Sequence, residues 1–314
     1  MSFEIPKQIY SGAIKPVTIG KGDKAITLGG ETSYPFYNFE GAMPNVPRIA
    51  LEIWDKDPGE DWPDPVKEPY KDVLGDPVAW AQKCVNDYGA EAIALILAST
   101  DPNGDDASPE AAAETAKKVA SAVDVPVIVY GTSNMEKDAE VLPVVAEACQ
   151  GLSLVIGPVQ DKNYKKIGAA ALGYNHSVSA NSPIDVNLAK QLNILLGQLG
   201  VKDSQILVDP TTGGLGYGME YSYSVMERDR MAALTQEDEK LQLPILSYLG
   251  HEVWKVKECK LSNEEAPELG DQKTRGVLME AITAVSLLLA GADLLVMRHP
   301  EAVKLTKEII QELA

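Results

Sequence analysis

Apolar and polar residues follow one repeating order through most of this chain. From residue 48 onward, short and almost continuously apolar runs alternate with longer stretches in which apolar residues recur at helical spacing. A continuous apolar run is typical of a strand buried on both faces of a parallel sheet. The strands that this order predicts are 48–54, 92–98, 127–130, 152–156, 177–180, 206–209, 245–249 and 294–297. The predicted helices are 77–88, 109–122, 137–148, 164–171, 185–199, 221–234, 274–289 and 301–313.

Eight successive strand–helix units indicate an α/β fold, the (β/α)₈ TIM barrel. A doubly wound open sheet is the alternative, and it requires a glycine fingerprint after an early strand. The glycine-rich run of this chain, 213–218, instead follows the sixth predicted strand. We therefore predict a barrel over residues 48–314 and an N-terminal extension over residues 1–47.

The N-terminal extension has its own pattern. Two β-like runs, 13–19 and 25–28, flank Lys-Gly-Asp at 21–23 and predict a hairpin. The following stretch, 29–47, is rich in glycine, proline and aromatic residues. These aromatic rings need burial, so the segment either plugs one end of the barrel or faces a partner protein.

Polar residues concentrate in the connections that leave the predicted strands, whereas the connections that enter strands are short and contain glycine. Barrels of this kind bind and react at the carboxyl ends of their strands. The run 206–218 (ILVDPTTGGLGYG) is the most distinctive of these exits. Its glycines allow positive φ and a close approach of backbone to a ligand or partner. We interpret it as a binding loop; a flexible surface loop is the alternative.

Charge and cysteine content exclude several classes of protein. The net charge of −18 argues against a nucleic-acid binder and against binding to an anionic membrane surface. Cys84, Cys149 and Cys259 are far apart, which argues against a disulfide framework or an iron–sulfur cluster held by this chain alone. No apolar run reaches the length of a membrane span, and the first residues lack the pattern of a signal peptide. We expect a cytoplasmic protein.

Catalytic and metal-binding patterns are weak. His251, His299 and Asp209 follow predicted strands and could meet, but their spacing carries no metal-site signature, so hydrogen-bonding roles are favoured. There is no GxSxG nucleophile motif, and the glycine-rich run lacks the lysine of a phosphate loop. That run suits hydrogen bonds to a large cofactor, or close packing on a partner.

Two long insertions follow predicted strands. The acidic, proline-rich segment 55–75 is interpreted as a solvated, ordered loop. The segment 251–272 is interpreted as a long loop in which Trp254 either packs back on the barrel or contacts a partner.

Several short motifs carry a resemblance to a known family. They are GGE at 29–31, PF at 35–36, FEG at 39–41, PNVP at 44–47, Glu52, Asp55, and DPTTGGLGY at 209–217. They resemble the small subunit of the corrinoid iron–sulfur protein, which belongs to the delta-subunit family of acetyl-CoA decarbonylase/synthase. The resemblance extends over essentially the whole chain.

The resemblance implies a noncatalytic TIM-barrel subunit of a methyl carrier. Such a subunit forms a heterodimer with a large subunit that holds a [4Fe–4S] cluster and the corrinoid domain, and its strand-end face covers the cobalamin. The methyl group comes from a methyltetrahydrofolate-dependent methyltransferase and passes to acetyl-CoA synthase. No residue of this chain is expected to be catalytic or to ligate the cobalt. The residues expected to contact the cofactor are Thr211, Thr212, Gly213 and Gly214, followed by Asp209, Asn103 and Arg298.

A second resemblance is to pterin-binding barrels, the dihydropteroate synthases and methyltetrahydrofolate methyltransferases. Asp209-Pro210 with the glycine-rich loop, and Arg298-His299 after the last strand, are similar to elements of those enzymes. Met219 stands where the synthases have a lysine, and Trp54-Asp55-Lys56-Asp57 replaces their Asn-x-Thr-Pro-Asp-Ser-Phe element. These departures favour a barrel without its own pterin chemistry. The alternative function is a pterin-dependent methyltransferase that uses Asp209.

Overall fold

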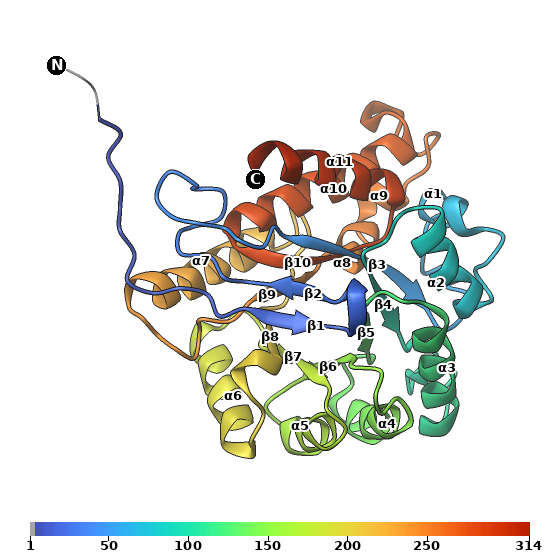
Figure 1. Ribbon diagram of the computed structural model, residues 1–314. Coiled ribbons are helices and arrows are strands. Elements are labelled where there is room, and N and C mark those ends of the chain that lie inside the picture. Colours follow the sequence, from blue (N-terminus) through green and yellow to red (C-terminus); the bar gives the residue numbers. More distant parts are fainter. Residues whose placement is uncertain (1–3) are drawn as a thin grey trace.

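Eight parallel strands close into a barrel in the computed structural model, which describes residues 4–314 (Figure 1). The last strand pairs with the first, in a register that sets Leu294 opposite Arg48 and Met297 opposite Leu51. The predicted TIM barrel is confirmed, and the open-sheet alternative is wrong. The barrel strands are β3 (Arg48–Trp54), β4 (Ala92–Ile96), β5 (Val127–Tyr130), β6 (Val155–Val159), β7 (Ser177–Asn181), β8 (Ile206–Asp209), β9 (Ile245–Tyr248) and β10 (Ala292–Met297).

Helices surround the barrel as an outer ring (Figure 1). Their starts carry the expected signals: the Ser108 side chain accepts a hydrogen bond from the Ala111 amide, and Pro109 occupies the first helical position. The α-helices are α1 (Asp64–Lys67), α2 (Pro77–Asn86), α3 (Pro109–Ala122), α4 (Met135–Ala148), α5 (Tyr164–Gly173), α6 (Val186–Leu199), α7 (Met219–Thr235), α8 (Gly250–Trp254), α9 (Lys257–Lys260), α10 (Gln272–Ala290) and α11 (Pro300–Leu313). The 3₁₀ turns are η1 (Gly22–Lys24), η2 (Glu68–Tyr70), η3 (Ala98–Thr100), η4 (Asp203–Gln205) and η5 (Pro267–Leu269).

The predicted N-terminal hairpin is present as β1 (Val17–Ile19) and β2 (Ile26–Leu28) and crosses one end of the barrel (Figure 1). Lys15 Nζ lies 2.7 Å from an Asp203 carboxylate oxygen, and Lys21 Nζ donates to the Gly151 carbonyl at 2.8 Å. Asp203 and Gly151 belong to connections that enter strands, so the hairpin covers the amino-terminal end of the barrel. The domain division after residue 47 stays a prediction.

The segment between the hairpin and β3 is only partly buried. Tyr34 and Phe36 pack against buried apolar residues, whereas Tyr37 and Phe39 are 48% and 44% exposed. Glu31 of this segment is buried next to Asp293 and Arg230. The segment therefore closes the end of the barrel, as the plug interpretation predicts, and it also leaves two aromatic rings on the surface.

The two insertions are more ordered than predicted. The segment 55–75 contains α1 and η2, and its Trp62 and Tyr70 are buried, so the description as a solvated loop is wrong for these rings. In 251–272, the predicted loop contains α8, α9 and η5, and Trp254 is fully buried against Gly276 of α10. Helices of four or five residues are stabilised by packing and carry too few residues to show helical periodicity.

One strand lies three residues later than predicted, because β6 includes Gly157 and Pro158. These residue types normally mark the end of a strand pattern. The three cysteines are all buried, as expected of small apolar residues. No helix within residues 4–314 combines the length and apolar character needed to span a bilayer.

Candidate functional site

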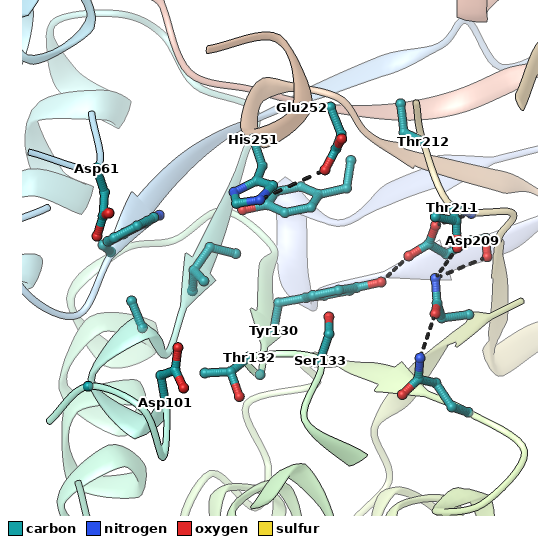
Figure 2. Close-up of a pocket in the computed structure, with 18 of the residues that line it drawn as sticks. Asp61, Asp101, Tyr130, Thr132, Ser133, Asp209, Thr211, Thr212, His251 and Glu252 are labelled. Atoms are coloured by element: carbon teal, nitrogen blue, oxygen red, sulfur yellow. Dashed lines mark hydrogen bonds and ion pairs between the residues drawn. The ribbon is translucent and has the colours of Figure 1, made fainter. Parts of the chain in front are cut away.

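A pocket of about 530 Å³ opens at the carboxyl ends of the barrel strands. Residues from the ends of seven strands or the connections that follow them line it, and Figure 2 shows many of them converging from opposite sides. The lining residues used below are Trp54, Ala98, Asp101, Tyr130, Thr132, Gln160, Asn181, Asp209, Thr211, Thr212, Tyr248, His251 and Glu252. The predicted polar mouth is therefore a real cavity.

Aromatic rings form a continuous row across this pocket. The ring centres of Tyr130 and Tyr248 are 5.6 Å apart, and those of Tyr248 and His251 are 6.0 Å apart with the planes only 11° from parallel. Trp54 adds a fourth ring at the end of β3. The pocket thus offers an apolar, aromatic surface surrounded by hydroxyl, amide and carboxylate groups.

Asp209 lies at the side of this row and is 3% exposed. The Tyr130 hydroxyl donates to its Oδ2, and the Thr211 amide donates to its Oδ1 at 2.9 Å (Figure 2). Burial raises the pKa of the Asp209 carboxyl, and burial together with the Asp209 charge raises the pKa of Tyr130 well above its usual value. Both oxygens of Asp209 are therefore engaged within the chain.

Thr211 is held in an unusual backbone conformation, with φ at +64°. A non-glycine residue adopts this region at a cost, so surrounding contacts must maintain it. Asn181 Nδ2 donates to the Thr211 hydroxyl at 3.0 Å, and the Ser222 hydroxyl donates to the Thr211 carbonyl at 2.9 Å. Gln160 in turn donates to Asn181 at 3.0 Å, so β6, β7 and β8 jointly fix this threonine.

The glycines that follow serve the loop itself. A Cβ on Gly213 would lie 2.5 Å from the Gly218 carbonyl carbon, and one on Gly214 would lie 3.1 Å from the Glu252 carbonyl oxygen. Neither glycine lines the pocket. Their close approach is therefore to this chain's own backbone, and a contact with a cofactor stays a prediction.

Arg298 lies beneath the pocket, fully buried with Glu52. Arg298 Nη2 donates to Glu52 Oε1 at 2.7 Å, and the side chains are 2% and 0% exposed. The guanidinium also lies over the Trp62 ring, 4.4 Å from its centre, and the Trp54 indole donates to the same Glu52 oxygen at 2.7 Å. Arg298 does not line the pocket, but its Nη2 contacts His251 Nδ1 at 3.2 Å.

The structure separates the predicted cofactor-contacting residues into two groups. Asp209, Thr211 and Thr212 line one wall of the pocket together. Asn103 is exposed on the β4–α3 connection outside the pocket, where its neighbour Asp101 lines the cavity instead. A role for any of these residues in binding a cofactor is untested.

Sequence reasoning missed the tyrosines of the aromatic row. Tyr130 and Tyr248 each occupy the last position of an apolar strand, where a ring is easily counted as core. Their position was the feature that could have identified them as pocket residues, because a hydroxyl-bearing side chain at the carboxyl end of a barrel strand faces the mouth of the barrel. Glu52 was a second such feature, because a carboxylate within an otherwise apolar strand is rarely buried without a partner.

His299 and His176 pack against, and hydrogen-bond to, other parts of the barrel. His299 is buried, stacks on Trp254 and caps α11 by accepting from the Glu301 amide. His176 lies at the opposite end of the barrel, where it contacts the backbone of Leu154 and Ala146. Within the part of the chain that the structure describes, no three His, Cys, Asp or Glu side chains are grouped to hold a metal ion.

Fold and pocket together define a TIM barrel with a cavity at its strand ends, and the fold is similar to that of the dihydropteroate synthases. The Yersinia pestis enzyme, solved with a pterine–sulfa conjugate, aligns with a TM-score of 0.58 and 14% identity, covering 90% of this chain and 98% of that one. The Coxiella burnetii enzyme, solved with pteroic acid, aligns with the same TM-score and identity, covering 88% and 95%. At this identity the likeness establishes the fold alone.

Residues 16–311 match the family model described as CO dehydrogenase/acetyl-CoA synthase delta subunit. The delta subunit of the acetyl-CoA decarbonylase/synthase complex of Archaeoglobus fulgidus is 38% identical over 99% of this chain and 71% of that protein. The corresponding Methanothermobacter thermautotrophicus subunit is 38% identical over 98% and 77%. The chain belongs to this delta-subunit family, which confirms the resemblance drawn from the motifs.

Proposed function

We propose that this chain is the small subunit of a heterodimeric corrinoid iron–sulfur methyl carrier and that its pocket face covers the cobalamin. Its large subunit would hold the [4Fe–4S] cluster and the corrinoid domain. The bound corrinoid supplies a cobalt centre that accepts and donates a methyl group. The methyl group would come from methyltetrahydrofolate through a methyltransferase and pass to acetyl-CoA synthase.

The aromatic pocket at the strand ends is the observation that carries this proposal. A corrinoid presents a conjugated, largely apolar ring edged with neutral amide side chains. Tyr130, Tyr248, His251 and Trp54 offer rings to such a plane. Hydroxyl and amide groups on the pocket wall suit the amide edge.

Unsatisfied polar atoms in the pocket lining support the fit. The hydroxyls of Thr132 and Thr212 and the Gln160 carbonyl oxygen are buried without a hydrogen-bond partner among residues 4–314. Buried polar groups are normally paired with protein, water or ligand. These atoms are therefore candidates to bind water or to bind the edge of a cofactor.

The size of the pocket indicates that this chain would cover one face of the cofactor and would not bind a whole cofactor by itself. A volume of about 530 Å³ suits a small ligand. A complete cobalamin is larger, so this chain would enclose one face while a partner holds the rest. Its contribution would be to exclude water and small oxidants from the cobalt centre.

The rival function, a pterin-dependent methyltransferase, needs the Asp209 carboxylate to bind a pterin ring. Asp209 is only 3% exposed, and each of its oxygens already accepts one hydrogen bond, from Tyr130 and from Thr211, so little of the carboxylate is accessible to a pterin ring. The rival predicts that the isolated chain binds methyltetrahydrofolate and that Asp209→Ala abolishes the binding.

Co-expression with a candidate large subunit, followed by anaerobic purification and a visible absorption spectrum, tests the proposal. We expect a one-to-one complex that carries more corrinoid than the large subunit alone. Ala98→Trp, which fills the pocket from η3, is expected to lower the corrinoid content. The matched control is Ala111→Trp on exposed α3 surface, which is expected to leave it unchanged. Equal corrinoid content with and without this chain would refute the proposal.

A further inference from the structure

The imidazole of His251 lies between the pocket and a buried cation. His251 lines the pocket with its side chain 45% exposed, and its Nδ1 lies 3.2 Å from Nη2 of the buried Arg298. A guanidinium group is a donor only and keeps its charge at every pH at which proteins fold. Nδ1 must therefore accept this hydrogen bond, and the proton of the neutral imidazole must be on Nε2.

The surroundings also disfavour protonation of the imidazole. The charged and titratable groups that face it are Arg298 after β10, Glu52 on β3, Glu252 within α8, Lys255 at the end of α8, and Tyr248 on β9. Burial, and then the charge of Arg298, lowers the pKa of His251, while Glu52 and Glu252 offset only part of this effect. The direction of this shift favours the neutral imidazole, whose Nδ1 accepts from Arg298.

Arg298 has little freedom to release His251. Glu52 accepts from the same Nη2 at 2.7 Å, and the guanidinium packs over the Trp62 ring. A Cβ on Gly250 would lie 2.9 Å from Arg298 Cγ, so the backbone of α8 approaches the arginine closely. Turning the imidazole over would set a C–H group against the guanidinium and lose the hydrogen bond.

We propose that Arg298 fixes His251 as the Nε2–H tautomer, so that the pocket presents a hydrogen-bond donor and no nitrogen lone pair at this position. Imidazole nitrogen is the commonest protein ligand for metals. If a corrinoid occupied the pocket, a free imidazole lone pair here could bind a metal, whereas an N–H group could not. The tautomer follows from the contacts above, whereas its consequence for a corrinoid rests on the proposed function.

The Nε2–H group remains available to a ligand. Glu252 Oε1 lies 3.8 Å from Nε2, beyond hydrogen-bond distance; the dashed line between the two side chains in Figure 2 marks this longer contact. His251 can therefore donate to a carbonyl group of a molecule in the pocket. Arg298 is a positioning residue, since it acts on the pocket only through His251.

Nitrogen-15 NMR of the full chain labelled with [15N]histidine tests the tautomer directly, because protonated and unprotonated ring nitrogens have well-separated shifts. The chain has three histidines, and His251→Gln identifies the signals of His251. His176 is an internal reference, since its Nδ1 accepts from the Leu154 amide at 3.0 Å and its Nε2 faces the Ala146 carbonyl at 2.9 Å. We expect His251 to show the same pattern as His176. A proton on Nδ1 at neutral pH would overturn the proposal.

The double variant Glu52→Gln/Arg298→Met removes the cation without leaving a buried carboxylate unpaired. We expect the His251 signals to move toward a mixture of tautomers while those of His176 stay unchanged. An unchanged His251 would refute the role of Arg298. If this variant does not fold, the wild-type spectrum decides, because a proton on His251 Nδ1 there would overturn the proposal.

The cobalt consequence has a separate readout. In the heterodimer with the corrinoid in its paramagnetic cobalt(II) state, we expect an EPR spectrum that is the same whether this chain carries 14N or 15N histidine. A change in nitrogen splitting with the isotope would show ligation by a histidine of this chain and would contradict the inference. A heterodimer without corrinoid would refute the proposed function and leave the NMR result standing.

Discussion

Breaking the ion pair beneath the pocket is expected to destabilise the barrel strongly. Glu52 and Arg298 are 246 residues apart in sequence and join the first and last barrel strands at 2.7 Å, with 0% and 2% of their side chains exposed. Glu52→Gln leaves the Arg298 cation buried without its counter-charge. Among residues 4–314, Arg298→Met leaves the Glu52 carboxylate with the Trp54 indole as its one remaining hydrogen-bond donor.

The expected magnitude follows from this burial. Removing one partner of a buried pair costs about 3–5 kcal/mol, whereas replacing both partners is often far less costly. We therefore expect each single variant to lose about 3 kcal/mol or more of unfolding free energy. The double variant Glu52→Gln/Arg298→Met should be at least about 2 kcal/mol more stable than the sum of the single effects predicts.

Equilibrium urea unfolding, followed by circular dichroism and tryptophan fluorescence, measures these changes. The matched control is the pair of Arg48 and Glu91 at 2.6 Å, whose side chains are 37% and 32% exposed. Arg48→Met and Glu91→Gln should each cost less than about 1 kcal/mol, because solvent screens an exposed pair. Additive effects of Glu52→Gln and Arg298→Met, within about 0.5 kcal/mol, would refute the reasoning.

Three further outcomes follow from single contacts. Tyr130→Phe leaves Asp209 Oδ2 buried without its donor and should cost about 1–3 kcal/mol of urea unfolding free energy; an unchanged value would contradict the hydrogen bond. Burial, with a contribution from Asp293, raises the pKa of Glu31 from 4.5 to about 9, so folding retains a proton that the unfolded chain releases. Stability should therefore fall as pH rises from 4.5 toward 9, by at most about 1.4 kcal/mol per pH unit from this group, and Glu31→Gln should flatten the profile. Gly213→Ala should loosen the loop through overlap with the Gly218 backbone, seen as faster proteolysis there; cleavage at the wild-type rate would refute the packing.

The barrel was predictable because its strands are short and buried on both faces. Arg48–Trp54 and Ile206–Asp209 have the bounds that the apolar runs predict. Local sequence signals did not predict the bounds of β6 or the two short helices α8 and α9. Gly157 and Pro158 look like a strand terminus but lie within β6, and α8 and α9 are too short to show helical periodicity.

The pocket was predictable in position but only partly in composition. The position of Asp209, Thr211 and Thr212 in the pocket was predictable, because they lie at or just after the carboxyl end of a strand and all parallel strands of a barrel end at the same mouth. The pairing of Glu52 with Arg298 was not predictable, since only closure of the barrel brings them together. The packing of Gly213 against Gly218 was likewise invisible, because a glycine-rich loop that folds on itself looks in sequence like one that binds a ligand.

Hydrogen–deuterium exchange of this chain, with the large subunit either loaded with corrinoid or free of it, would show whether the pocket face covers the cofactor. Comparing the two complexes separates the cofactor from the protein interface. We predict that corrinoid slows amide exchange in the strand-end segments 98–107, 130–134 and 210–218, and not in the hairpin of β1 and β2 at the other end of the barrel. Equal exchange in these segments with and without corrinoid, or protection confined to the hairpin, would contradict it.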